Sequence, residues 1–229
     1  MRIIDLSKTI AGEDHRHIPF EGHPISTDYR LVNSHEKDGR TNATLMFNIH
    51  EGTHIDPPYH FIEDGLTIDE IPIESFFAPA NIVRIHNAPA GEPISLQQVF
   101  DNSDLPAELA GRILIVDSAW DSRASKDEYY TRAPYLSQEL ADWLVEKGVR
   151  AVGLTNPPDK VEPPHKGDAP IHRTLLGNGV LIIENLANLD AITATNFYIA
   201  AFPLKIYRGC GGPARVVALL DFDETSVAA

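Results

Sequence analysis

The chain has 229 residues, of which 43% are hydrophobic, and its 19 basic and 33 acidic residues give a formal charge of −14 at neutral pH. This length and apolar content suffice for one sizeable core, so we expect a single domain over residues 1–229. The negative charge would repel a phosphate backbone and argues against nucleic-acid binding. Early charges do not fit a signal peptide, no apolar run approaches the roughly 18 residues of a membrane span, and a single cysteine fits a reducing compartment, so we expect a cytoplasmic protein without membrane partners.

Short runs rich in β-branched and other apolar residues predict strands along the whole chain. These runs are residues 2–6, 43–49, 80–85, 112–116, 151–155, 180–183, 200–206 and 214–220. The polar stretch between the first two contains prolines and glycines and predicts a long loop. A proline-rich loop is expected over residues 157–170, and the glycine-rich residues 209–213 predict the turn between the last two strands.

The clearest predicted helix covers residues 137–148. Ser137 can cap its first turn, Leu140 and Leu144 recur at helical spacing, and Gly148 marks its end.

The most informative segment holds His50, His54, Asp56 and His60 within eleven residues. Imidazole nitrogens and a carboxylate together suit divalent zinc, manganese or iron, whereas the lone Cys210 provides no thiolate set for a structural zinc site. The segment therefore predicts a metal site, and a catalytic rather than a structural one.

Geometry constrains how these groups could share an ion. On an extended strand His50, His54 and Asp56 would project to one side, but four extended residues span roughly 13 Å, so the chain must bend near Gly52 or the groups must serve two ions. The double proline after Asp56 stops regular pairing and places His60 on a turn that can fold over the metal.

Two alternatives compete with this interpretation. Residues 50–54 match the zincin pattern of two histidines four apart with a glutamate between them, but that pattern needs a helix, which Gly52 and the double proline disfavour. The four groups could also be ordinary surface or cleft side chains. Their density argues against that.

A second concentration of ligand types follows at His172 and at Glu184, the latter directly after the apolar run 180–183. Taken singly, each is an ordinary helix-start histidine or strand-end carboxylate.

Residues 52–61, Gly-Thr-His-Ile-Asp-Pro-Pro-Tyr-His-Phe, resemble the motif of the metal-dependent cyclase/hydrolase family that includes bacterial kynurenine formamidases and isatin hydrolases. Residues 172–180 and 182–189 resemble that family's second block, and residues 133–153 resemble the block between them. The resemblance covers most of residues 1–220 and implies an α/β fold of the swivelling β/β/α type, as one cyclase-like domain.

The resemblance also implies roles for individual residues. His50, His54, Asp56, His172 and Glu184 would be metal ligands, with Asp56 able to bridge two ions, and His60 would be the general acid/base. One or two zinc or manganese ions per chain and a homo-oligomer, a dimer or tetramer, are expected on the same basis. An ion held there would lower the pKa of a water molecule towards 7 and stabilise an oxyanion, which is the chemistry of amide hydrolysis.

The aromatic residues Phe20, Phe47, Tyr59 and Trp120 are the expected substrate-binding residues, and they indicate only a flat, apolar molecule. The resemblance implies a small aromatic or cyclic amide such as N-formylkynurenine or isatin. The chain departs from the family at Cys210, in a turn that usually carries an aspartate. Two other functions stay open at this stage: dehydration or cyclisation of a small carbonyl compound by a lyase, and metal binding without catalysis.

Overall fold

The computed structural model describes residues 1–10, 27–125, 128–161, 168–194 and 196–222. Its strands are β1 (Arg2–Asp5), β2 (Asp28–Asn33), β3 (Asn42–Met46), β4 (His54–Asp56), β5 (Phe77–Arg84), β6 (Pro93–Ile94), β7 (Ile113–Asp117), β8 (Tyr135–Leu136), β9 (Ala151–Leu154), β10 (Leu181–Glu184), β11 (Asn196–Pro203) and β12 (Gly212–Leu220). Its α-helices are α1 (His35–Asp38), α2 (Leu96–Asp101), α3 (Trp120–Arg123), α4 (Gln138–Glu146) and α5 (Pro170–Gly177). Short 3-10 turns are η1 (Pro58–His60), η2 (Ile73–Phe76) and η3 (Leu189–Ala191).

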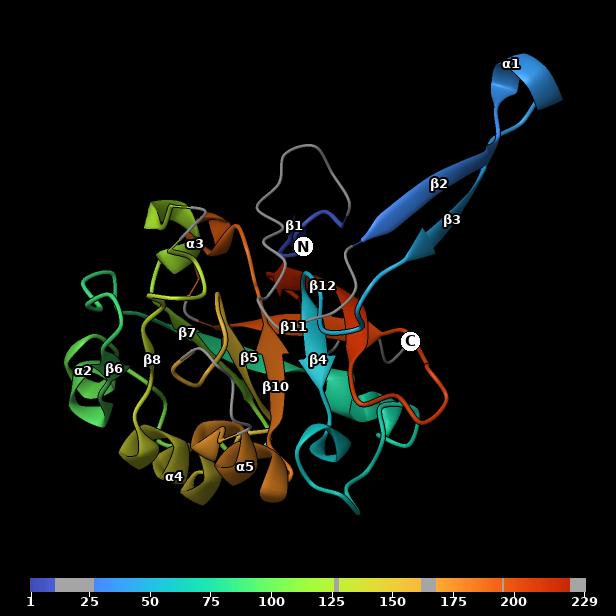
Figure 1. Ribbon diagram of the computed structural model, residues 1–229. Coiled ribbons are helices and arrows are strands. Elements are labelled where there is room, and N and C mark those ends of the chain that lie inside the picture. Colours follow the sequence, from blue (N-terminus) through green and yellow to red (C-terminus); the bar gives the residue numbers. More distant parts are fainter. Residues whose placement is uncertain (11–26, 126–127, 162–167, 195, 223–229) are drawn as a thin grey trace, which may run out of the picture.

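A closed barrel forms the body of the molecule (Figure 1). The main sheet has the order β1-β12-β11-β5-β7-β9-β10-β4, and an additional pairing between β12 and β4 closes seven of these strands into a ring. Strands β5, β7, β9 and β10 run parallel, while β4, β11 and β12 pair antiparallel. Strand β4 pairs with β10 on one side and with β12 on the other, so it completes the ring.

Strand β7 shows how the sequence builds two cores. All five of its residues are buried, and because side chains on a strand alternate, Ile113 and Ile115 pack inside the barrel while Leu114 and Val116 face the helices. Helices α2, α4 and α5 cover this outer face, on one side of the barrel (Figure 1).

Helix α4 confirms the helix predicted over residues 137–148. The Ser137 side chain accepts a hydrogen bond from the Leu140 backbone N–H at 3.2 Å, and Gly148 follows the helix with a positive φ of 64°. Leu140 and Leu144 are fully buried in the outer core, as their spacing predicts. The predicted strands all exist, with bounds shifted by a few residues.

The long loop predicted before residue 43 is partly wrong. Strand β2 and helix α1 lie within it, and β2 pairs with β3 to form a two-stranded arm that projects from the barrel (Figure 1). Strand β3 overlaps the strand predicted over residues 43–49, whereas β2 was missed; neither strand buries a side chain. Within the described residues, no helix is both long and apolar enough to cross a membrane.

Candidate metal centre

Strand β4 carries His54 and Asp56 on the outer face of the barrel, the face that α5 covers. Between them Ile55 points into the barrel core, as the alternation of a strand requires. The pairing with β10 sets Glu184 opposite His54 and sets Ile182, a residue of the outer core, opposite Asp56. Three of the five expected ligands therefore share one face of a two-strand ribbon.

His50 reaches the same place because the chain bends before β4. Gly52 has a positive φ of 69°, a conformation that glycine adopts without the strain imposed by a side chain. The bend brings His50 Nδ1 to 2.8 Å from Asp56 Oδ1, while His54 Nε2 lies 3.3 Å from the same oxygen. His54 Nδ1 donates to the Gly52 carbonyl at 3.0 Å, which leaves Nε2 facing the cluster. Residues 50–54 are thus a turn leading into a strand, and the zincin arrangement is wrong.

His60 and His172 close the cluster from η1 and α5. The His60 ring stacks on the His50 ring with centroids 3.9 Å apart, and it meets the His172 ring edge-on at 5.7 Å. His172 Nε2 lies 3.2 Å from Glu184 Oε1 and 3.7 Å from Asp56 Oδ2. The structure therefore brings together every residue that the sequence predicts for the metal and for the general acid/base.

The donor set fits a divalent ion. Asp56 is completely buried, and its Oδ2 has no hydrogen-bond partner within the described part of the chain. A buried carboxylate oxygen without a partner is costly unless a cation satisfies it. Ligand atoms of His50, His54 and Asp56 lie within 4.8 Å of one another, and so do those of Asp56, His60 and His172. Asp56 is common to both groups, which places it at the centre.

Charge in the cluster is arranged around Asp56. Burial alone would raise its pKa, but the charges of His54 and His60, the nearby His172 ring and the hydrogen bond from His50 outweigh burial and hold the pKa well below its ordinary value. The centre therefore keeps a carboxylate at neutral pH.

The imidazoles differ from one another in their affinity for protons. Burial lowers the pKa of His50, but hydrogen bonds with Asp56 and Cys210 outweigh it and raise the pKa to about 10. In the same way burial lowers the pKa of His172, but the hydrogen bond to Asp159 and the nearby carboxylates of Asp56 and Glu184 outweigh it and raise the pKa well above its ordinary value. For His60 burial dominates and lowers the pKa to about 3. Without an ion, protons on His50 and His172 supply the positive charge that the carboxylates require.

Two contacts of the cluster have no counterpart in the sequence prediction. Cys210 Sγ lies 3.5 Å from His50 Nε2, because the turn 209–213 packs against the His50 ring. Asp159, predicted only as part of a proline-rich loop, lies 2.6 Å from His172 Nδ1. Neither could have been found by spacing, since both are more than ten residues from the histidine they contact.

Of the expected substrate-binding aromatics, Phe47, Tyr59 and Trp120 lie within the described residues, in different parts of the structure. Phe20 lies outside the described residues, and Phe47 is half-buried between the arm and His50. Trp120 is buried against Tyr129 and donates its indole N–H to the Tyr129 carbonyl at 2.7 Å. Their role in substrate binding stays a prediction.

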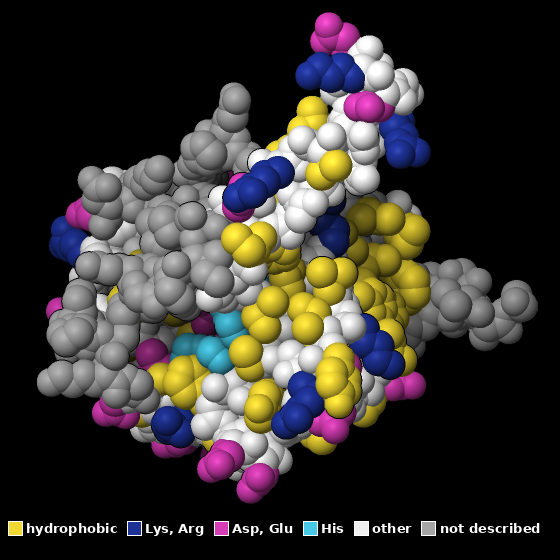
Figure 2. Space-filling view, turned by 45° about the vertical axis from the view of Figure 1, so that its right-hand side comes forward, with side chains coloured by type: hydrophobic (Ala, Val, Ile, Leu, Met, Phe, Trp, Pro, Cys, Tyr) yellow, Lys and Arg dark blue, Asp and Glu magenta, His cyan; other side chains and the backbone are white. Residues whose placement is uncertain are grey.

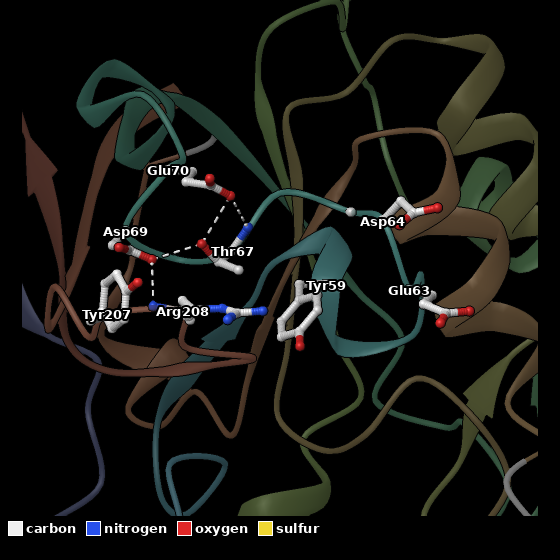
Figure 3. Close-up of a pocket in the computed structure, with 9 residues that line it drawn as sticks. Tyr59, Glu63, Asp64, Thr67, Asp69, Glu70, Tyr207 and Arg208 are labelled. Carbon is white, nitrogen blue, oxygen red and sulfur yellow. Dashed lines mark hydrogen bonds between the residues drawn. The ribbon is translucent and has the colours of Figure 1, made fainter.

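Tyr59 lines an open cavity of about 420 Å³. Figure 3 shows the Arg208 side chain extending toward Tyr59, with carboxylates around the remaining wall. The carboxylates belong to Glu63, Asp64, Asp69 and Glu70. On the surface, histidine side chains gather at one place bordered by hydrophobic side chains (Figure 2).

Comparison with known proteins identifies the family. A family model described as "Putative cyclase" matches residues 4–157. The chain belongs to this cyclase family. Two curated kynurenine formamidases are similar to it: that of Bacillus mycoides is 32% identical over 190 residues, covering 82% of this chain and 85% of the relative, and that of Geobacillus thermodenitrificans is 29% identical over 213 residues, covering 93% and 94%.

Solved structures confirm the α/β fold of the cyclase family. Isatin hydrolase A from Labrenzia aggregata, bound to benzyl benzoate, superposes with a TM-score of 0.82 at 24% identity, covering 96% of this chain and 94% of that one. The swivelling β/β/α architecture implied by the sequence resemblance is therefore correct.

Proposed function

We propose that this chain is a metal-dependent hydrolase that cleaves the carbon–nitrogen bond of a small aromatic or cyclic amide. The observation that carries the proposal is the buried Asp56 carboxylate, with an unsatisfied oxygen, at the centre of imidazoles from residues 50–60 and from α5. Relatives named kynurenine formamidase align over most of the chain, and isatin hydrolases share its fold. N-Formylkynurenine and isatin are accordingly the first substrates to test.

The ligands in this proposal are His50, His54, Asp56, His172 and Glu184, and the ion is zinc or manganese, one or two per chain. Mixed imidazole and carboxylate ligation suits both metals. An ion held by these groups would polarise the amide carbonyl and lower the pKa of a water molecule, which is the chemistry that hydrolysis needs.

His60 is the general acid/base of the proposed reaction. Burial lowers its pKa to about 3, so its imidazole is neutral at pH 7, which is the protonation state from which a general base starts. Its position over His50, within reach of the cluster but on a separate turn, suits delivery of that proton to the departing nitrogen.

Turnover of N-formylkynurenine and isatin, followed by ultraviolet absorbance, tests the proposal. Enzyme stripped of metal should be inactive and should recover with zinc or manganese. Reaction in oxygen-18 water should place the label in the product, whereas a lyase would turn over without incorporating it. If the metal-bound protein turns over neither compound, N-formylkynurenine and isatin are not its substrates.

The role of His60 has its own test. His60→Ala should lower kcat by a factor of about 10² to 10⁴, the contribution of a general acid/base, and leave the metal content unchanged. His86→Ala is the control, because His86 is exposed and lies outside the cluster. Loss of metal in His60→Ala would show that His60 is a ligand. Full activity of the metal-bound variant would show that His60 is not the general acid/base.

The chain also assembles into a homo-oligomer in this proposal, through the arm. Cross-strand pairs Tyr29–Leu45 and Leu31–Ala43 put apolar side chains on one face of the arm, and Tyr29 and Leu31 are more than half exposed. A two-stranded ribbon such as this arm (Figure 1) is marginally stable alone, and an exposed apolar face is typical of an interface. Leu45→Lys should dissociate the oligomer in sedimentation experiments, while Thr44→Lys, on the opposite face, should not.

Two further parts of the proposal concern the whole chain. Residues 1–229 act as a single domain, which the near-complete alignment with the Geobacillus thermodenitrificans relative supports. The protein works in the cytoplasm, where its single cysteine stays reduced.

A further inference from the structure

Asp159 holds the His172 imidazole from the side opposite the metal cluster. Its Oδ2 accepts a hydrogen bond from His172 Nδ1 at 2.6 Å and a second from the His172 backbone N–H at 2.9 Å. Its Oδ1 accepts a third from the Ile171 backbone N–H at 2.9 Å. The carboxylate is buried, with 8% of the residue exposed, so these bonds face little competition from water.

The same carboxylate replaces a missing helix cap. Helix α5 begins with Ala169 at the N-cap position and Pro170 after it, and Ala169 has no side chain that could accept a hydrogen bond. Two of the backbone N–H groups left free at this helix start are those of Ile171 and His172, and both donate to Asp159. A residue ten positions upstream therefore fixes both the start of α5 and the ring that α5 carries.

The contact also fixes the tautomer. A carboxylate only accepts hydrogen bonds, so the proton of a neutral His172 ring lies on Nδ1. Its Nε2 is then left with a lone pair, and that atom faces Glu184 Oε1 at 3.2 Å and Asp56 Oδ2 at 3.7 Å. Rotation of the ring would break the 2.6 Å contact to Asp159.

We propose that Asp159 is a positioning residue of the metal centre, which presents Nε2 of His172 to the ion by holding Nδ1 and the first turn of α5. This inference rests on the proposed metal function. Carboxylates that orient ligating histidines in this way contribute about 10- to 100-fold to metal affinity or activity.

The experiment measures the zinc dissociation constant by competition with a chromophoric chelator. Asp159→Ala, which removes all three hydrogen bonds, should weaken zinc binding about 10- to 100-fold. Asp159→Asn can keep at most two of the three, because one of its terminal groups is a donor, and should fall between the wild type and Asp159→Ala. If Asp159→Ala fails to fold, Asp159→Asn carries the test.

Asp117→Ala is the matched control. Asp117 is equally buried, also accepts a backbone N–H and has a histidine, His86, within 4 Å, yet it lies outside the cluster. The Asp117→Ala variant should bind zinc with the affinity of the wild type.

The outcomes separate the two proposals. Wild-type affinity in folded Asp159 variants, even with a lowered melting temperature, would reduce Asp159 to a helix cap and overturn the inference while leaving the metal function standing. A wild-type protein that binds neither zinc nor manganese would overturn both. A graded loss across the variants, with Asp117→Ala unchanged, supports Asp159 as a positioning residue.

Discussion

Gly211 is the position where one added methyl group should disturb the metal centre most directly. A Cβ on Gly211 would lie 2.5 Å from Cε1 of the His50 ring and 2.9 Å from each of its nitrogens. Carbon atoms pack at about 3.5 to 4.0 Å, so the ring or the turn must move by roughly 1 Å. Gly211 does not have a positive φ, so alanine strains the structure through this contact rather than through its own backbone.

The expected cost of Gly211→Ala follows from that displacement. His50 is held between Asp56 at 2.8 Å and the stacked His60 ring, so it cannot retreat without leaving the cluster. A misplacement of about 1 Å in a catalytic site can lower activity about 100-fold. Overpacking of this kind costs about 1 to 3 kcal/mol of stability, which should leave the protein folded.

Metal content after dialysis, zinc affinity and kcat/KM should be measured on Gly211→Ala and on Gly177→Ala. Gly177 ends α5, and a Cβ there would meet only Ile62 Cδ1 at 3.5 Å, an ordinary contact, so this control should keep wild-type metal binding and activity. A folded Gly211→Ala protein with unchanged metal affinity and turnover would refute the placement of His50 as a ligand at this turn.

Three further results are expected. Ser137→Ala should lower the free energy of unfolding by about 1 kcal/mol in urea, because it removes the cap of α4; an unchanged midpoint would contradict that role. The pKa of Asp5 is lowered in the folded protein, because hydrogen bonds from Arg215 and Ser7 outweigh the opposing effect of burial. The ionised Asp5 side chain therefore stabilises the folded state above the unfolded pKa of about 3.9. This stabilisation is lost as the pH falls through the folded pKa. The stability difference between the wild type and Asp5→Asn should therefore be present at pH 7 and shrink below pH of about 4, and a constant difference would contradict this. Because His50 and His172 hold protons in the metal-free protein, zinc binding at pH 7 should release protons, measurable by calorimetry in buffers of different ionisation enthalpy; binding without release would show that these rings are already neutral.

The local half of the metal site could be predicted from the sequence because it depends on one short segment. Strand alternation puts His54 and Asp56 on one face, and the glycine between His50 and His54 permits the bend that brings His50 back. The double proline ends β4 and starts η1, so the position of His60 on a turn followed from the same segment.

The other half depends on strand register between distant segments. Glu184 meets His54 because β10 pairs with β4, and His172 arrives because α5 packs over β10. Nothing in residues 172–184 specifies that register, so these ligands came only from the resemblance to a family. Asp159 and Cys210 were missed for the same reason, since each acts on a histidine through tertiary contact alone.

The two-stranded arm shows where prediction from the sequence was incomplete. Sequence patterns predict elements by the apolar face that an element buries. Strand β2 buries none of its residues and was missed, whereas β3 overlaps the apolar run predicted as a strand over residues 43–49. If the arm packs on a second copy, its apolar pairs are an interface pattern rather than a core pattern, and this is why β2 was assigned to a loop.

Closure of the barrel and construction of the site use the same turn. Residues 209–213 bring Gly212 and Pro213 into register with Ile55 and His54, which joins β12 to β4 and closes the ring. In that position Gly211 lies against the His50 ring. Larger residues would be excluded here, because a Cβ on Gly212 would lie 2.7 Å from Pro203 Cβ. Gly211 is therefore required by the proposed ligand His50, and Gly212 by the pairing of β12 with β4 that closes the barrel. Strand β4 is only three residues long and carries two of the proposed ligands, and Glu184 lies opposite His54 on β10, so an ion bound to these groups would also tie β4 to β10.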